Sequence, residues 1–380
     1  MVKEGVNILH VLNTPRAEGT PNLVLDWLSV GSQMNLRQSV VVLNSTPTDL
    51  TDRLRDAAER YVEHDLFSCG RKKFPLISRA VYRAARESAA DLVVCWPTGF
   101  ANWACVGARL AGVKRLLVHS GNPATRGLRA DWMARYCFWP LQAINARVIC
   151  CSDYVRDQVR AIPLIRKSMF HTVWNCARVS GVSERAAAAR SSRREDSLAS
   201  RPTIIMVATF EDHKDHPILI RALPHLIEDY PDLRLILVGD GSRRAELERL
   251  AQQAGVAHAV DFMGTRMDVP ELLGVADAFV FATTPREGLG TVLIEALAAG
   301  LPVVASDVPA CRELLQNGAR GSLVPANNPI ALAEAVSATL RSAGTNSGQR
   351  TSGQNFARSF TPQKMISEYL KLVGIEVPHA

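Results

Sequence analysis

The sequence predicts an α/β protein built from two doubly wound parallel-sheet domains, on three observations. The chain has 380 residues, 47% hydrophobic and 21% charged, which is typical of a globular protein long enough for at least two domains. Short β-branched runs alternate with amphipathic helical stretches in both halves, as in βαβ units. The alternation is interrupted once, by the polar stretch 182–201.

Residues 1–181 form the first predicted domain. Each predicted strand is a short aliphatic run, and the sequence between strands has helical periodicity. We expect strands at 7–12, 39–43, 92–95, 116–119 and 148–151, and the clearest helices at 19–30, 102–111 and 131–143.

The Ala-, Ser- and Arg-rich stretch 182–201 is predicted to be an exposed linker, because it lacks apolar periodicity. The alternative is that its first part extends a helix, which would leave the domain boundary in place. The second predicted domain spans 202–358, and 359–380 is expected to form a C-terminal helix that packs back on the first domain. A Gly-, Ser-, Asn- and Gln-rich loop is expected at 342–354. We expect strands at 203–208, 235–238, 260–263, 278–282, 303–305 and 322–324, and helices at 217–229, 243–254, 291–299, 330–341 and 361–373. Two such domains would leave a cleft between the carboxyl edges of their sheets, the usual place for a ligand.

The amino terminus and the cysteines predict a cytoplasmic protein. The chain starts MVKEGVNILHVLN, which has no features of a signal peptide, and no apolar run is long enough to span a membrane. The eight cysteines show no CxxC spacing, so we expect buried thiols in a reducing compartment rather than disulfides or a zinc site.

Charge is concentrated in the first half. Residues 1–180 carry 24 Lys or Arg against 14 Asp or Glu, and residues 101–180 carry 12 against 3. Net charge indicates partners rather than fold. Nucleic acid, an acidic lipid surface and a phosphorylated acceptor are all compatible with this excess.

The most informative motif is PREGLGTVLIEALAAGLPVVASD at 285–307. Gly288 and Gly290 precede a helix that is expected to start at Thr291, and a glycine turn before a helix N-terminus suits a diphosphate. Glu287 and Glu295 flank this turn and could accept hydrogen bonds from the hydroxyls of a ribose and a sugar. Taken alone, the pair would more simply be two solvated glutamates at a helix start.

This stretch resembles the Glu-x7-Glu element of the retaining nucleotide-sugar glycosyltransferases of the GT-B class, their family four. The resemblance implies a GT-B architecture of two Rossmann-like domains facing across a cleft. It extends through most of the second half and more loosely through the first. The matching segments include VATFEDHKDHPILIRAL, LRLILVGDG, VDFMGTRMDVPELLGVADAFVFATTPREGLG, GSLVPANNPIALAEAV, NILHVLN and RLLVHSGNP.

The resemblance implies roles for residues of the motif. Glu295 would hold the nucleotide ribose and Glu287 would contact the donor sugar. The amides around Gly288, Leu289 and Gly290 would meet the sugar and the diphosphate. Lys214 would neutralise the departing diphosphate, because a cation near a leaving group stabilises charge that grows in the transition state.

Five further positions are candidates, and three of them (Thr209, Gly19 and His119) are compared with the family pattern. Thr209 stands where the family commonly has an arginine, so half of the usual cationic clamp is absent or comes from elsewhere. Gly239 and Asp240, with Gly241, form a tight strand-to-helix turn that is expected to line the pocket near Lys214, and a plain structural turn is the alternative. Gly19 is the one glycine of a loop where the family has a pair, and it would let the backbone approach the donor. His119 would contact the transferred sugar. A histidine that only caps its strand is the plain alternative for His119.

Three aromatic residues recur at helical spacing, with two arginines among them. Trp132, Tyr136 and Trp139 are interleaved with Arg129 and Arg135. Such a stripe is usually part of a hydrophobic core. The second interpretation places this helix at a membrane surface, where Trp, Tyr and Arg are favoured.

We therefore expect a retaining transferase that moves a sugar from a UDP- or GDP-sugar to an acceptor hydroxyl, without a divalent metal or other cofactor. The expected acceptor is a lipid-linked or polysaccharide intermediate of bacterial surface glycan synthesis. The expected location is cytoplasmic, with peripheral contact to the anionic inner face of the membrane. A sugar-nucleotide epimerase and a non-catalytic partner subunit remain alternatives. A nucleic-acid-binding module is not favoured, because no recognition motif accompanies the basic charge.

Overall fold

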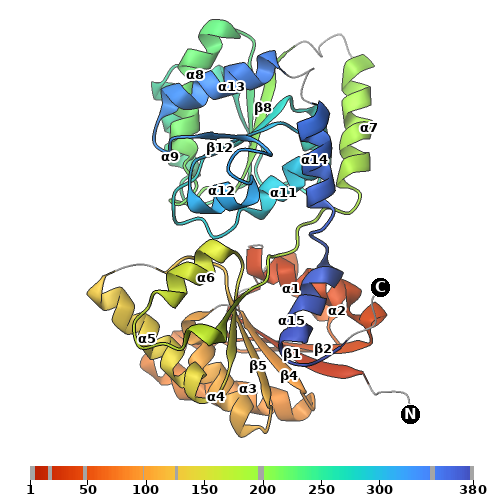
Figure 1. The fold of residues 1–380 in the computed structure, drawn as a ribbon, viewed down its shortest axis with the longest axis vertical. Helices are drawn as coiled ribbons and strands as arrows, with labels where there is room; N and C mark the ends of the chain where they lie inside the picture. Colours follow the sequence, from red (N-terminus) through yellow and green to blue (C-terminus); the bar gives the residue numbers. More distant parts are fainter. Residues whose placement is uncertain are drawn as a thin grey trace. The chain divides into compact units, whose positions relative to one another are not determined.

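The structure is a computed structural model in which the chain divides into two compact units. The first unit comprises Met1–Cys176 and Pro362–Ala380, and the second comprises Ala177–Thr361. Each unit is a parallel sheet between two layers of helices (Figure 1). The described residues are 5–15, 19–45, 49–96, 98–124, 127–195, 201–342 and 347–376.

The first unit contains a seven-stranded parallel sheet in the order β3-β2-β1-β4-β5-β6-β7. Its strands are β1 (Val6–Leu12), β2 (Leu36–Val42), β3 (Arg60–Glu63), β4 (Leu92–Trp96), β5 (Arg115–Ser120), β6 (Arg147–Cys150) and β7 (Phe170–Thr172). Its helices are α1 (Gly19–Gly31), α2 (Asp49–Ala57), α3 (Lys73–Glu87), α4 (Ala101–Leu110), α5 (Leu128–Ala143), α6 (Asp153–Arg160) and α15 (Pro362–Leu372). Helices α1, α2 and α15 pack together on one face, and α3, α4 and α5 on the other.

The second unit contains a six-stranded parallel sheet in the order β10-β9-β8-β11-β12-β13. Its strands are β8 (Thr203–Val207), β9 (Arg234–Val238), β10 (Val260–Phe262), β11 (Ala278–Phe281), β12 (Val303–Ser306) and β13 (Ser322–Val324). Its helices are α7 (Val182–Glu195), α8 (His216–Asp229), α9 (Arg244–Gln253), α10 (Val269–Val275), α11 (Thr291–Ala298), α12 (Pro309–Leu314), α13 (Pro329–Arg341) and α14 (Ser347–Ala357). Both sheets are doubly wound, as the sequence predicts.

The C-terminal helix α15 is part of the first unit although the second unit precedes it in the chain. Its buried residues Met365, Ile366 and Tyr369 join the core cluster that includes Trp27 of α1 and Trp96 of β4. Burial of these aromatic and aliphatic side chains stabilises the packing of α15 on the first unit.

The prediction of an exposed linker at 182–201 is wrong for residues 182–195, which form α7, so the helical alternative holds for this part. Alanines allow α7 to pack closely on α10: a Cβ added to Gly274 would lie 2.4 Å from the carbonyl oxygen of Ala186. Arg185 also pairs with Glu271 at 2.6 Å. Helix α7 thus packs through small side chains and ion pairs of arginine, so its polar composition gives no amphipathic pattern that predicts a helix. The remainder of the stretch, 196–200, lies outside the described residues.

The loop expected at 342–354 is also partly wrong, because α14 begins at Ser347. A Cβ on Gly353 would lie 2.9 Å from Cδ2 of Leu297, so a glycine gives α14 its close approach to α11. Residues of low helix propensity are accepted here because tertiary packing outweighs propensity.

The cysteines are mostly buried, as expected, with Cys69 exposed and Cys137 partly exposed. Among the described residues, no helix is both long enough and apolar enough to cross a bilayer.

Candidate functional site

The candidate site lies at the carboxyl edge of the second sheet, where the strand order reverses. Strands β8 and β11 are neighbours there, but the chain leaves them toward opposite sides. Ligands of doubly wound sheets bind at this switch point. Lys214 lies in the loop after β8, and Glu287 to Gly290 lie in the loop after β11. The topology thus brings together two segments that are far apart in the sequence.

Backbone hydrogen bonds join these two loops. Lys214 and Thr283 form an antiparallel bridge. The amide of Asp215 donates to the carbonyl of Ala282 at 3.0 Å, and that of Thr284 donates to His213 at 3.1 Å. These main-chain hydrogen bonds therefore fix the backbone of Lys214 next to the loop after β11.

Lys214 and Glu287 form an ion pair through Nζ and Oε2. Their side chains are only 12% and 9% exposed. The Lys214 ammonium also lies 4.9 Å from the centre of the Phe281 ring, a favourable cation–π arrangement. Each charge is thus compensated by the other in a largely desolvated site. Burial of either charge alone would cost much more free energy.

Glu287 is ionised at neutral pH despite its burial. Desolvation raises its pKa, but the Lys214 charge and hydrogen bond, with a further contribution from His213, outweigh this and lower it. The pKa of His213 is itself lowered, by burial and by the Lys214 charge. Glu287 is therefore an acceptor of hydrogen bonds at this edge of the sheet.

The glycine turn after β11 leads into α11 through a left-handed residue. Gly290 is the N-cap of α11 with φ +79°, and a Cβ there would lie 3.1 Å from Cε1 of Phe281. The Gly288 amide donates to Glu287 Oε1 at 3.2 Å. The first amides of a helix have no partner within it. This turn and the start of α11 therefore have the geometry expected of an anion site, and anion binding there stays a prediction.

The other motif residues lie on the same turn and helix. Leu289 is buried, and Thr291 is the half-buried first residue of α11. Glu295 follows Thr291 by about one helical turn, so the two share a face of α11, and it too is half-buried. The structure thus gathers Lys214, Glu287 and the 288–291 turn, with Glu295 one turn into the helix.

Thr209, Gly239 and Asp240 form the neighbouring part of this edge, after β8 and β9. The Phe210 amide donates to the Asp240 carbonyl at 3.0 Å. Gly239 has φ +138°, and a Cβ on it would lie 2.0 Å from the Ala208 oxygen, so only glycine fits. Thr209 and Asp240 are exposed.

Sequence reasoning missed the side chains that support these loops. The Thr283 hydroxyl donates to the His213 carbonyl at 2.8 Å, and its amide donates to Ser306 Oγ at 3.0 Å. The Arg243 amide donates to the Phe210 carbonyl at 3.2 Å, and its Nη1 lies 3.5 Å from Asp212 Oδ1 in the loop after β8. Its guanidinium is held by Glu246, with Nη2–Oε1 at 2.6 Å. Because these contacts join separate loops, no local sequence signal indicates them.

His119 and Gly19 belong to the first unit. His119 is 1% exposed at the end of β5, and its Nδ1 lies 2.8 Å from the Tyr369 hydroxyl of α15. Burial lowers the pKa of His119 to about 4, so the ring is neutral. A Cβ on Gly121 would lie 3.2 Å from His119 Nε2, so the Nε2 edge of the ring faces the loop that follows β5. Its predicted contact with a sugar stays a prediction.

Gly19 is the exposed first residue of α1, and a Cβ on it would meet nothing within 4 Å. The fold therefore does not require glycine at this position, and a role in ligand approach stays a prediction. Within the described ranges, no group of three or more His, Cys, Asp or Glu side chains is arranged to hold a metal ion.

Comparison with known proteins matches the second unit to one family. Residues 189–355 match the model of glycosyl transferases group 1. The phosphatidyl-myo-inositol mannosyltransferase of Mycobacterium leprae is 36% identical over 160 residues, which cover 38% of this chain and 42% of that protein. The putative glycosyltransferase EpsF of Bacillus subtilis is 27% identical over 308 residues, covering 79% of each chain. The match to the mannosyltransferase thus spans about two fifths of its length.

Solved structures resemble the whole chain. Anabaena Alr3699/HepE in complex with UDP aligns with a TM-score of 0.81 at 19% identity, covering 97% of this chain and 100% of that one. WaaG, a glycosyltransferase involved in lipopolysaccharide biosynthesis, aligns with a TM-score of 0.70 at 18% identity, covering 97% and 100%. At such identities the likeness establishes the fold alone. Residues 189–355 are therefore similar to the glycosyl transferases group 1, and the chain as a whole has the GT-B fold of two parallel-sheet α/β domains.

Proposed function

We propose that this protein is a retaining glycosyltransferase that moves a sugar from a nucleoside diphosphate sugar to an acceptor hydroxyl. The observation that carries the proposal is the buried Lys214–Glu287 pair beside the glycine turn of α11, at the switch point of the second sheet. The group 1 match of residues 189–355 supports the same activity.

Donor binding would exchange the partners of the ion pair. The diphosphate would take the Lys214 ammonium and the amides of the turn from Gly288 to Thr291, because both favour an anion. Glu287, released from Lys214, would accept hydrogen bonds from the sugar hydroxyls, and Glu295 would accept them from the ribose. In the unliganded state the ion pair keeps both charges compensated, so the site needs no counter-ion to remain folded.

The chemistry follows from this placement. The bond between the anomeric carbon and the diphosphate breaks, and the acceptor oxygen attacks from the same face, which preserves the anomeric configuration. The acceptor proton passes to the departing diphosphate oxygen. Lys214 and the α11 amides stabilise the charge that grows there, as preorganised donors do in other enzymes. We therefore propose that no divalent metal is needed.

The donor is proposed to be a UDP- or GDP-sugar. One solved relative in fold, HepE, contains UDP, and a partial sequence relative is described as a GDP-mannose-dependent mannosyltransferase. We propose a lipid-linked or polysaccharide acceptor in bacterial surface glycan synthesis, with the enzyme at the cytoplasmic face of the membrane. The phosphatidylinositol acceptor in the names of the mannosyltransferases supports an acceptor of this kind.

Donor binding and turnover test the proposal together. A panel of UDP- and GDP-sugars is screened by thermal shift, because a ligand of the folded state raises its apparent stability. Glu295→Ala should weaken binding of the best donor by tenfold or more, since one hydrogen bond to a charged group is worth about 1.5–3 kcal/mol. Glu228→Ala, an exposed glutamate of α8, is the matched control and should bind normally.

The product distinguishes the alternatives. A transferase forms a glycoside with the anomeric configuration of the donor, as seen by NMR, whereas an epimerase releases an epimerised sugar nucleotide. A non-catalytic partner subunit, the alternative that Thr209 raises, would bind donor without turnover. Unchanged donor affinity and turnover in Glu295→Ala would refute the proposed site.

A further inference from the structure

Exposed large hydrophobic side chains gather on one part of the first unit. Four of them lie on α5: Trp132, Met133, Tyr136 and Trp139 are 65%, 70%, 52% and 45% exposed. The stripe of Trp132, Tyr136 and Trp139 is therefore not in the core, which is the usual place for such a pattern. Leu164, 72% exposed, lies in the loop after α6. We call these five residues the aromatic patch.

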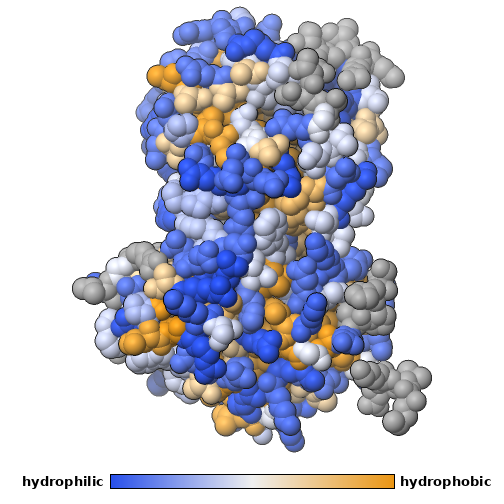
Figure 2. Space-filling view, in the orientation of Figure 1, coloured by the Kyte–Doolittle hydropathy of each residue, from blue (hydrophilic) through white to orange (hydrophobic). Residues whose placement is uncertain are grey.

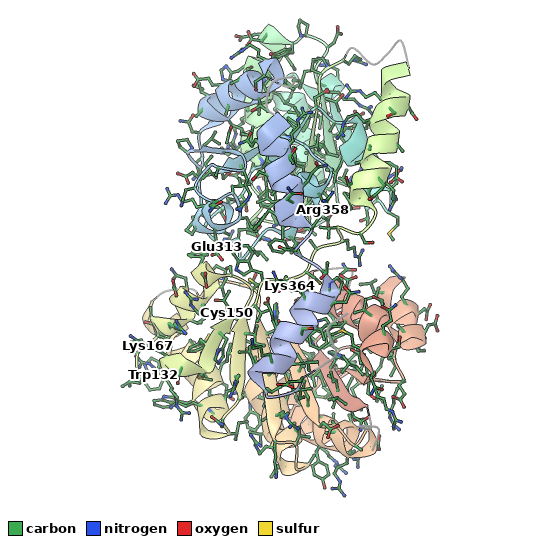
Figure 3. All side chains as sticks on the ribbon, turned by 45° about the vertical axis from the view of Figure 1, so that its right-hand side comes forward. Trp132, Cys150, Lys167, Glu313, Arg358 and Lys364 are labelled. Atoms are coloured by element: carbon green, nitrogen blue, oxygen red, sulfur yellow. The ribbon has the colours of Figure 1, made fainter. Side chains whose placement is uncertain are left out.

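The aromatic patch is one continuous surface. Trp139 Nε1 donates to the Leu164 carbonyl at 3.2 Å, and the Arg166 amide donates to Gln142 Oε1 at 2.6 Å. These bonds join the loop after α6 to the side of α5. In Figure 3, Trp132 and Lys167 lie at the same edge of the first unit, and in Figure 2 this edge shows hydrophobic atoms beside hydrophilic ones.

The ring polar atoms of Trp139 and Tyr136 are hydrogen-bonded within the protein. Trp139 uses its indole N–H on Leu164, and the Tyr136 hydroxyl accepts from Trp103 Nε1 at 2.9 Å. The exposed part of these two rings is therefore apolar. Its contact with water is unfavourable, and transfer of this surface into an apolar layer would lower the free energy.

Basic side chains border the patch. Arg129, Arg166 and Lys167 are exposed, and the Arg135 guanidinium lies 6.0 Å from the centre of the Trp132 ring. The one acidic residue of α5, Asp131, is only half-exposed. Exposed aromatics bordered by cations match an anionic bilayer, in which Trp and Tyr enter the headgroup layer and Lys and Arg meet the phosphates.

We propose that the aromatic patch and its basic border dock this protein onto an anionic phospholipid surface. A second copy of the chain is the competing occupant. The basic border favours the bilayer, because two identical positive rims would repel each other across a symmetric contact. The docking surface lies wholly within the first unit, so it does not depend on the donor site.

Vesicle sedimentation of the full-length protein tests the proposal. The probes are vesicles of phosphatidylcholine alone and vesicles of equimolar phosphatidylcholine and phosphatidylglycerol. The protein should bind the anionic vesicles at least tenfold more tightly, because each Lys or Arg near an anionic surface contributes about fivefold. Equal binding to both, or none to either, would overturn the proposal.

Two pairs of variants test whether vesicle binding depends on the aromatic patch and its basic border, or on exposed hydrophobic and basic residues in general. Trp132→Ser/Met133→Ser should lower binding to anionic vesicles about tenfold or more, since two exposed apolar side chains lose their burial. The matched control is Met267→Ser/Ile330→Ser, which removes two exposed hydrophobics of the second unit and should change nothing. Equal loss in both double variants would overturn the proposal.

The second pair tests the charges. Arg166→Glu/Lys167→Glu should also lower anionic binding at least tenfold, whereas Arg79→Glu/Arg86→Glu should not. The latter residues are exposed on α3, from which α4 separates α5. Circular dichroism checks that each variant is folded. If the patch variant loses self-association in sedimentation velocity while vesicle binding is unchanged, the occupant is a second copy and the lipid proposal fails.

Discussion

Lys214→Ala should destabilise the second unit far more than loss of an ordinary ion pair, because it leaves Glu287 charged in a site where the two side chains are 12% and 9% exposed. Removing one partner of a buried pair costs about 3–5 kcal/mol, whereas exposed pairs are worth about 0–1 kcal/mol. For a unit of this length, 3 kcal/mol lowers the melting temperature by about 6–12 °C. Arg234→Ala is the matched control, since it breaks a pair whose side chains are 44% and 40% exposed.

The assay can assign the loss to one unit. All six tryptophans lie in the first unit, so their fluorescence follows its unfolding, while far-UV circular dichroism follows both units. Lys214→Ala should move the circular dichroism transition and leave the fluorescence transition near its wild-type position. Lys214→Met/Glu287→Gln should recover much of the loss, because it removes both charges together.

The loss of stability in Lys214→Ala should depend on pH, in a direction set by the pKa of Glu287. In the wild type the pKa of Glu287 is lowered, so its contribution is present above the unfolded pKa and is lost only as the pH falls through the folded value. Without Lys214, burial would raise the pKa of Glu287, so protonation on going from pH 7 to pH 5 should shrink the loss of stability. The reasoning is refuted if Lys214→Ala behaves like Arg234→Ala, or if its loss grows on acidification.

Three further results are expected. Gly290→Ala should cost about 1–2 kcal/mol, because it places a Cβ at φ +79° and 3.1 Å from Phe281, while Gly19→Ala should leave the melting temperature within a degree or two; equal melting temperatures would contradict this account of the turn. The first unit should lose stability between pH 6.5 and 4, since burial lowers the pKa of His10 and His119 to about 4 and the unfolded chain takes up their protons first; a tryptophan-fluorescence profile as steep in His119→Gln as in the wild type would argue against it. Turnover should be the same in excess chelator as without it, because Lys214 and the α11 amides are proposed to carry the diphosphate charge, and strict metal dependence would exclude that mechanism.

Patterns that repeat along the chain were sufficient to predict two parallel sheets and all their described strands except β3 and β7. Aliphatic runs separated by amphipathic helices predict parallel βαβ units, because each strand is buried on both faces and each helix on one. The glycine turn before α11 was also predictable, since the positive φ of Gly290 and the helix start are local properties of EGLGT. For the long aliphatic strands and the glycine turn, the signal lay within one element and its flanks, and the sequence alone determined the outcome.

Tertiary structure decided what depends on contacts between distant segments. The pairing of Lys214 with Glu287 joins the ends of β8 and β11, and only the order of strands in the sheet makes these ends neighbours. His119 is covered by Tyr369, which returns from the far end of the chain. Helix α7 was mistaken for a linker because alanines and arginines gain their stability from α10 and not from a hydrophobic stripe. The aromatic stripe of α5 has the spacing of a core helix, and only the absence of a described layer over it leaves it exposed. Spacing determines which residues share a face, whereas burial of that face depends on what the rest of the chain places against it.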